Sequence, residues 1–261
     1  MTVVDTHCHA GNSWFEPIES LLFQMDANGV EKAALIQHRG VFDNSYLLES
    51  AGRHPGRFAV VAMVDSSEPD APDALERWAT EGAVGVRIEP TERSPGSDPH
   101  ALWKKARDLG LVVSCSGGVE GFASDGFAEL VSELSDLTFI IEHLAGVGVG
   151  AQPPFSAYEK ALDLARFPNT YIKVGGLGEI SGRPSVLHPA FHFDHTPPLI
   201  EMAYDAFGPQ RMMWGSDYPP VSNREGYRNA LEGVRDHPAF KSDEDRDWVM
   251  GGTAMIVFGF G

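Results

Sequence analysis

The stretch VVDTHCH, residues 3–9, is a strand-like run that ends in two histidines one residue apart. Successive side chains of a strand point to opposite faces, so this pattern predicts that Asp5, His7 and His9 share one face. Two imidazoles on one strand edge can converge on a metal ion or on a substrate oxygen. The same pattern also arises by chance or as a hydrogen-bonded strand end, so the rest of the chain must decide between these interpretations.

Short runs rich in β-branched residues alternate with helix-like segments along the chain. The helix-like segments carry apolar residues at three- and four-residue spacing, and many stop at a glycine such as Gly29 or Gly110, where a left-handed C-cap is needed. Strands that alternate with helices predict a parallel sheet, and eight such units close most naturally into an α/β (β/α)8 TIM barrel. We expect one domain over residues 1–261, with strands at residues 3–5, 32–37, 58–64, 84–88, 111–115, 138–142, 170–174 and 211–214.

A doubly wound nucleotide-binding sheet is the alternative α/β architecture. It would carry a glycine-rich phosphate loop after the first strand, where this chain has His7-Cys8-His9 instead. The glycine-rich run at residues 146–150 follows the sixth expected strand and contains no lysine. We interpret that run as a loop between a strand and a helix and favour the barrel.

The charge of the chain limits its partners. Its 261 residues include 20 Lys and Arg against 37 Asp and Glu, a formal net charge of −17. Nucleic acids and anionic membranes are bound chiefly through basic patches, and no basic cluster occurs, so neither is expected as a partner. Because apolar runs of membrane-helix length and a signal-peptide pattern are both missing, we expect a cytoplasmic protein that binds a small molecule, as a monomer or a homo-oligomer.

The expected strand ends carry a concentration of polar and charged side chains. In a TIM barrel, catalytic groups lie at the carboxyl ends of the strands, so residues from separate strands meet at one rim. Each of these side chains alone has a structural explanation, but their joint placement predicts an active site. The residues at these ends are His7, His9, Gln37, His38, Asp65, Arg87, Glu89, Cys115, Glu142, His143, Lys173 and Asp217.

Five motifs resemble those of the amidohydrolase-related (type 2) family, in the same order and over nearly the whole chain. The motifs are DTHCH at residues 5–9, GVR at 85–87, EHLAG at 142–146, YIKVGG at 171–176 and WGSDYP at 214–219. An H-x-H pair alone is a weak signal, but together with a late G-S-D-[WY]-P it is a strong one. The lactonase branch, which includes pyrone-dicarboxylate lactonase and sugar lactonases, is the most similar. The resemblance implies a hydrolase acting on a lactone or related cyclic ester of a small carboxylated or sugar-derived substrate.

The chain departs from the metal-dependent decarboxylases of this family at the fifth strand. Those enzymes carry a histidine ligand there, whereas this chain has Ser114-Cys115-Ser116. A zinc or other divalent ion would then be held by His7, His9, Asp217 and His143, which leaves room for a water ligand. A metal-free mechanism stays open, since the lactonase branch includes members without a metal. Cys115 could supply a thiolate ligand or could equally face the helices.

The resemblance assigns catalytic roles to Asp217 and His143. Asp217 is expected to act as general base on the attacking water, and His143, with His7 and His9, to polarise the carbonyl directly or through the ion. An aspartate before a Tyr-Pro-Pro turn can also serve only as a cap.

Four further residues are expected to contact the substrate. Arg87 and Lys173 would bind a substrate carboxylate, with Gln37 and His38 beside them. Structural alternatives are a pair of Arg87 with Glu89 or Asp65, and a buried pair of Lys173 with Glu142.

Two other functions and one other site remain open from the sequence. A metal-dependent decarboxylase of an aromatic or unsaturated acid is disfavoured by the fifth strand, and a non-catalytic binding protein by the set of polar strand ends. The loop histidines His188, His192 and His195 could form a second metal site, although a proline-rich loop with solvated histidines is the simpler interpretation.

Overall fold

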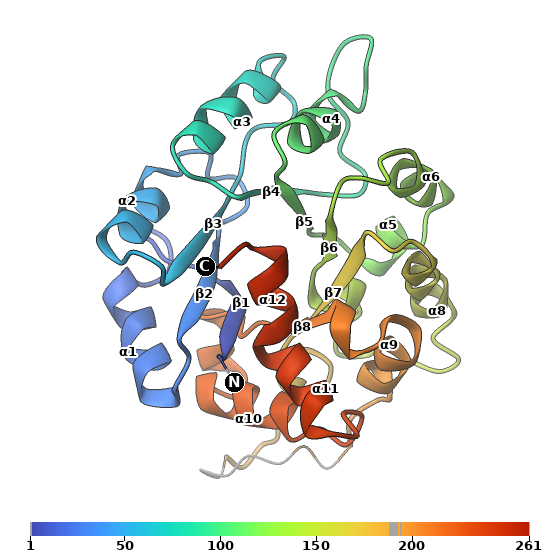
Figure 1. Ribbon diagram of the computed structural model, residues 1–261. Helices are drawn as coiled ribbons and strands as arrows, with labels where there is room; N and C mark the ends of the chain where they lie inside the picture. The colour runs from blue at the N-terminus through green and yellow to red at the C-terminus, as the bar shows by residue number, and fades with distance from the viewer. Residues whose placement is uncertain (1, 188–192, 194, 261) are drawn as a thin grey trace.

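The computed structural model describes residues 2–187, 193 and 195–260, and its strands form one parallel sheet in the order β1 to β8. The strands are β1 Val4–Cys8, β2 Lys32–Ile36, β3 Phe58–Ala62, β4 Gly85–Ile88, β5 Val112–Cys115, β6 Phe139–Ile141, β7 Thr170–Val174 and β8 Met212–Trp214. The ring closes where Cys8 bridges to Tyr218 just beyond β8, and His9 N donates to Tyr218 O at 2.8 Å. The predicted TIM barrel is confirmed (Figure 1).

Helices surround the barrel (Figure 1). They are α1 Ile18–Asn28, α2 Ser45–Arg53, α3 Ala71–Thr80, α4 Ala101–Asp108, α5 Val119–Phe122, α6 Asp125–Glu133, α7 His143–Gly146, α8 Ser156–Leu162, α9 Leu199–Phe207, α10 Tyr227–Arg235, α11 Asp243–Asp247 and α12 Thr253–Val257. Short 3-10 turns are η1 Asp163–Arg166, η2 Leu177–Glu179, η3 Pro209–Arg211 and η4 Pro220–Asn223, and the π-helix η5 is Trp248–Gly252. Gly29 ends α1 in a left-handed conformation (φ 68°), as the sequence predicts. In the described part of the chain, no helix combines the length and apolar character needed to cross a membrane.

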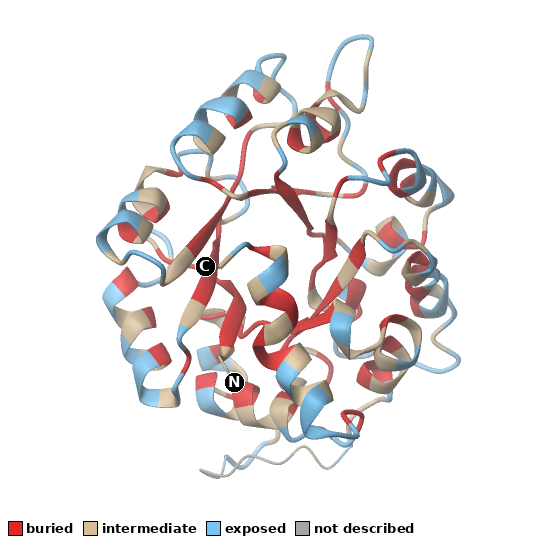
Figure 2. Ribbon diagram, in the orientation of Figure 1, coloured by how far each residue is buried: buried red, intermediate tan, exposed pale blue. Residues whose placement is uncertain are grey.

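Two apolar layers lie on the two sides of the strands, which are buried along their length (Figure 2). The larger layer packs the strands against the surrounding helices. The smaller layer fills the barrel interior, where Ala34, Ile140 and Met213 pack with Ala254 and Phe258 from the C-terminal segment. Because α12 lies across the ring of strands in Figure 1, it closes one end of the barrel, and the polar strand ends belong to the other end.

A bulge in β1 corrects the expectation that Asp5 shares a face with His7 and His9. Asp5 pairs with Ala33 and Cys8 pairs with Leu35, so three steps along β1 match two steps along β2. Because of the extra residue, Asp5 and Cys8 both lie on the helix side of β1. His7 and His9 point into the barrel. Strict alternation fails at this point.

Asp5 has a structural role on the helix side of β1. Its carboxylate accepts hydrogen bonds from Ser216 N at 2.8 Å, Ser216 Oγ at 2.6 Å and Tyr227 Oη at 2.9 Å. Ser216 directly precedes Asp217, so Asp5 fixes the end of β8 against the start of β1.

Candidate active site

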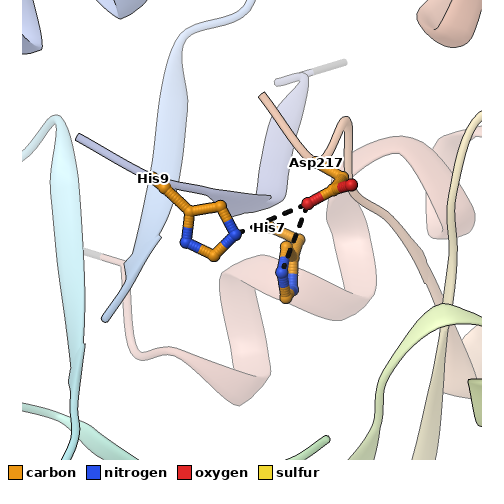
Figure 3. A group of neighbouring side chains, drawn as sticks. All are labelled: His7, His9 and Asp217. Atoms are coloured by element: carbon orange, nitrogen blue, oxygen red, sulfur yellow. Dashed lines mark ion pairs between the residues drawn. The ribbon is translucent and has the colours of Figure 1, made fainter. Parts of the chain in front are cut away.

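His7, His9 and Asp217 converge at the mouth of the barrel (Figure 3). Asp217 Oδ1 lies 3.4 Å from His9 Nε2 and 3.9 Å from His7 Nε2. His9 Nδ1 lies 2.7 Å from the carbonyl oxygen of Ile36, which can only accept, so Nδ1 carries the proton. His9 Nε2 therefore faces Asp217 with its lone pair when the ring is neutral.

The backbone at Asp217 is held in an unusual conformation. Its φ is 57°, in the left-handed region that an aspartate adopts at some cost, and its N–H donates to His7 O at 2.7 Å. This hydrogen bond joins the end of β8 directly to β1. The carboxylate consequently points toward the two imidazoles of β1 rather than capping the following turn.

His7 lies deeper in the barrel, beside a buried cation. Its Nδ1 is 3.3 Å from Lys173 Nζ and 3.8 Å from Glu142 Oε1. Burial lowers the pKa of His7 well below its usual value, and the charges of His143 and Lys173 lower it further. His7 is therefore neutral. Among the residues that the structure describes, its Nε2 is buried and has no hydrogen-bond partner.

His143 is oriented by a carboxylate that the sequence analysis did not identify. Its Nδ1 lies 3.1 Å from Glu179 Oε2, and its ring centroid is 4.3 Å from that of His7. Burial alone would lower the pKa of His143, but the carboxylates of Glu179 and Asp217 outweigh it and raise the pKa to about 9. His143 is therefore an imidazolium at neutral pH, with Nδ1–H donating to Glu179.

A left-handed turn places His143. The φ angles of His143, Leu144, Ala145 and Gly146 are 50°, 49°, 59° and 69°, and the first three are not glycines. Such strain persists only where the surrounding structure fixes it, and it is concentrated at functional sites. Two features exclude a side chain at Gly146. Its φ is positive, and a Cβ there would lie 2.1 Å from the carbonyl oxygen of Gly117.

Gly146→Ala is therefore expected to lower the free energy of unfolding by about 2–3 kcal/mol, from strain and from the clash with Gly117. Urea unfolding followed by circular dichroism measures this change. Gly148→Ala is the matched control in the same loop, because the nearest atom to its Cβ lies 4.0 Å away. An equal effect of both substitutions would contradict the assigned strain.

A buried polar layer lies beneath the histidines. Arg87 donates to Glu142 Oε2 from Nη2 at 2.7 Å and from Nε at 3.2 Å, and Ser114 Oγ donates to Glu142 Oε1 at 2.7 Å. Lys173 Nζ lies 3.9 Å from Glu142 Oε1 and donates to Ser114 Oγ at 2.9 Å. The partner of Arg87 is thus Glu142, and neither of the two carboxylates considered from the sequence. The second alternative for Lys173, a pair with Glu142, is present.

The pKa values of this layer follow from its isolation from water. Burial alone would raise the pKa of Glu142, but Arg87 and Lys173 outweigh it and hold the pKa well below the usual value of 4.5. Burial lowers the pKa of Lys173 to about 8, against the opposing charge of Glu142. Both cations are already compensated by a protein carboxylate, and their contact with a substrate stays a prediction.

Gln37 and His38 lie at the end of β2, on the rim of the site. The Gln37 amide donates to Asp43 O at 2.8 Å and accepts from His38 N at 2.8 Å, so both ends of this side chain are engaged by the protein. The His38 ring packs edge-on against Phe15, with ring centroids 4.6 Å apart, and Phe15 stacks on His9 at 4.9 Å. Their substrate contacts also stay predictions.

The site opens into a cavity of about 370 Å³ lined by His143, Val147, Glu179, Asp217 and Arg224. Arg224 donates to Asp217 Oδ2 at 2.6 Å, yet it was missed in the sequence. Arg224 and Glu179 lie in loops, outside the strand-end motifs. The sequence pointed to Arg224 only as an arginine seven positions after Asp217, in the last loop of the barrel.

The donor atoms of the site fit a divalent cation. One ligand atom from each of His7, His9 and Asp217 lies within 4.8 Å of the others, and His7, Glu142 and His143 form a second such group. The unpartnered Nε2 of His7 and the free lone pair of His9 Nε2 are suitable ligands.

Cys115 and the loop histidines, the other metal ligands considered from the sequence, are not part of this set. Cys115 Sγ lies 3.8 Å from Val113 O in the layer between strands and helices, so the thiol faces away from the site. His188 and His192 lie outside the described residues, and the second metal site suggested for them with His195 stays untested.

Comparisons with known proteins relate this chain to others of similar sequence. The family described as Amidohydrolase matches residues 4–260. The 4-sulfomuconolactone hydrolase of Rhizobium radiobacter is 24% identical over 210 residues, covering 78% of this chain and 66% of the relative. The L-fucono-1,5-lactonase of Burkholderia ambifaria is 25% identical over 214 residues, covering 77% and 68%. This chain thus spans about two thirds of the length of these relatives.

Solved structures share the fold. An amidohydrolase from Burkholderia multivorans with bound zinc has a TM-score of 0.81 at 18% identity, covering 99% of both chains. A probable 2-pyrone-4,6-dicarboxylic acid hydrolase from Acinetobacter baumannii with bound citric acid has a TM-score of 0.76 at 18% identity, covering 99% of this chain and 100% of the other. At these identities the likeness concerns the fold alone.

Proposed function

Because this chain belongs to the amidohydrolase family, we propose that it is a hydrolase that opens a lactone or related cyclic ester. The observation that carries the proposal is the position of Asp217 Oδ1 opposite Nε2 of His7 and His9 at the barrel mouth. A base beside two imidazoles suits attack of water on a bound carbonyl. The two curated relatives, both named for lactone hydrolysis, support the same reaction class.

Asp217 is proposed as the general base. Burial alone would raise its pKa, but the neighbouring His9 and the charges of His143 and Arg224 outweigh burial and lower it, so the carboxylate is ionised at neutral pH. It accepts one proton from the attacking water, whose oxygen forms a bond with the carbonyl carbon of the lactone.

His143 is proposed as the acid of the same reaction. Its imidazolium can donate Nε2–H to the oxygen on which negative charge develops, while Glu179 holds Nδ1–H. When the ring C–O bond of the tetrahedral intermediate breaks, the leaving alkoxide takes the His143 proton. The proton on Asp217 is then transferred to His143 through solvent, which restores both residues, and the product is a hydroxy acid.

A divalent ion of the zinc class would be held by His7, His9 and Asp217, whose ligand atoms lie within 4.8 Å of one another, whereas the imidazolium of His143 has no lone pair to offer. When bound, it supplies Lewis-acid polarisation of the carbonyl and lowers the pKa of a bound water. Without it, the Nε2–H of His143 is the hydrogen-bond donor to the carbonyl oxygen, because Nε2 of neutral His9 carries a lone pair. Metal analysis followed by exhaustive chelation separates the two cases, because activity that is lost and then restored by Zn²⁺ requires the ion, whereas retained activity excludes an obligatory metal.

The charges of the site favour a neutral, sugar-derived lactone over a polycarboxylate. Arg87 and Lys173 lie beside Glu142, and Arg224 lies beside Asp217. A substrate carboxylate would have to displace one of these carboxylates, in a protein whose net charge is −17.

We expect kcat/KM for hexonolactones to exceed that for carboxylated pyrones and muconolactones by at least about tenfold. A pH-indicator assay over both groups of lactones measures the ratio, since ring opening releases acid. Preference for the carboxylated group would contradict the charge argument and would leave the hydrolase assignment intact. A decarboxylase would instead release CO₂ without this acidification, and a binding protein would give no turnover.

A further inference from the structure

Arg224 joins two carboxylates that come from different loops of the barrel. Its Nη1 donates to Asp217 Oδ2 at 2.6 Å, and its Nη2 donates to Glu179 Oε1 at 3.3 Å. A guanidinium is planar and presents its donors in a fixed fork, so two acceptors on one fork do not turn independently. The orientation of the Asp217 carboxylate is therefore coupled to that of Glu179.

Both carboxylates have a second partner in the site. Asp217 Oδ1 lies 3.4 Å from His9 Nε2, and Glu179 Oε2 lies 3.1 Å from His143 Nδ1. Arg224 engages the other oxygen of Asp217 and thereby leaves Oδ1 directed at the imidazole. Negative and positive groups alternate from Asp217 through Arg224 and Glu179 to His143, so each charge is compensated by its neighbours.

A buried carboxylate lies beside Arg224 on another side, at ion-pair distance and without a hydrogen bond. Arg224 Nε lies 3.5 Å from Glu225 Oε2, and Glu225 is fully buried and accepts from Gly178 N at 3.1 Å. A Cβ at Gly176 would lie 1.9 Å from Glu225 Oε1, and one at Gly178 would lie 2.0 Å from Oε2. Glycines at these two positions therefore make room for the carboxylate. The guanidinium is hydrogen-bonded to two carboxylates and has a third carboxylate beside it, so it can act as a rigid spacer.

We propose that Arg224 is a positioning residue, which fixes Asp217 directly and the ring of His143 through Glu179. The proposal rests on the proposed lactone hydrolysis for its kinetic test, while its structural test does not need activity. Removing the guanidinium leaves two carboxylates facing each other without a cation between them. Both would turn away, and a displacement of about 1 Å in a catalytic group costs about 100-fold in rate.

The kinetic test compares Arg224→Ala and Arg224→Lys with the unsubstituted protein on a lactone that it hydrolyses. We expect kcat to fall about 100-fold in Arg224→Ala, with KM changed by less than about threefold. Arg224→Lys keeps the charge but lacks the fork, so it should recover only part of the loss. Arg228→Ala removes an exposed arginine four positions away, paired with Glu232, and should leave kcat unchanged.

Chemical rescue separates positioning from a general loss of structure. Arg224 lines the open cavity, so added guanidinium ion can enter the space left in Arg224→Ala and should raise kcat at least about tenfold. Sodium chloride at equal ionic strength should not. An unchanged kcat in Arg224→Ala, or equal stimulation by both salts, would overturn the proposal.

Crystal structures of the unsubstituted protein and Arg224→Ala provide the test that is independent of activity. We expect the Asp217 carboxylate to rotate away from His9, and Glu179 to leave His143 Nδ1. Unmoved carboxylates would overturn the positioning role even if the variant were inactive. If the unsubstituted protein hydrolyses no lactone, the proposed function fails, and these structures still decide the role of Arg224.

Discussion

Asp217→Asn is expected to lower kcat for lactone hydrolysis by about 1000-fold or more, because an amide cannot accept the proton of the attacking water. The side chain keeps its shape, and its oxygen can still accept from Arg224. The thermal unfolding temperature should therefore change little. Initial rates in the pH-indicator assay, together with a melting curve, measure both quantities.

The control for this substitution is Asp125→Asn, since Asp125 pairs with Lys160 on the surface and its side chain is 85% exposed. Its rate should match that of the unsubstituted protein. Near-normal activity in Asp217→Asn would remove Asp217 from the mechanism. Loss of folding in that variant would instead indicate that the carboxylate is structural.

Glu142→Ala is expected to lower the free energy of unfolding by about 3–5 kcal/mol, the usual cost of removing one partner of a buried ion pair. Arg87 and Lys173 would remain in the barrel interior without a compensating charge. The folded-state pKa of Glu142 is depressed below its usual 4.5, so its contribution to stability is present above that pH and is lost as the pH falls below it. Urea unfolding at neutral and acidic pH measures the magnitude and its direction.

Glu76→Ala is the matched control, because Glu76 pairs with Lys105 on the surface and its side chain is 55% exposed. Its effect should be small beside that of Glu142→Ala, because an exposed ion pair is screened by water. A similarly small effect of Glu142→Ala would show that water or another group compensates the two buried cations, and it would contradict the described polar layer.

The barrel could be predicted from the sequence because its signals are local. Short apolar runs, most of them rich in β-branched residues, marked the strands, and glycines such as Gly29 marked helix ends. The bulge in β1 could not be predicted, because it depends on pairing with β2 across the sheet. The bulge places Asp5 on the helix side of the strand, whereas strict alternation predicted that Asp5 shares a face with His7.

Part of the candidate site was predictable in its members, and less of it in its pairings. Strand-end motifs identified His7, His9 and Asp217, and the structure brings them together. The pair between Arg87 and Glu142 joins strand ends that are not neighbours in the sheet, so only the closed barrel reveals it.

The positions of Glu179 and Arg224 depend on loop conformation, which carries little pattern in the sequence. The sequence therefore predicted which strand ends lie close together, and the partners that set their charges became visible only in the structure.

A crystal structure of Asp217→Asn soaked with a lactone that the unsubstituted protein hydrolyses tests the central claim most directly. We predict density for an intact ring at the barrel mouth, with its carbonyl carbon near the substituted side chain and its carbonyl oxygen facing His143 and His7. A lactone bound away from these residues, or an empty mouth at saturating concentration, would contradict the account.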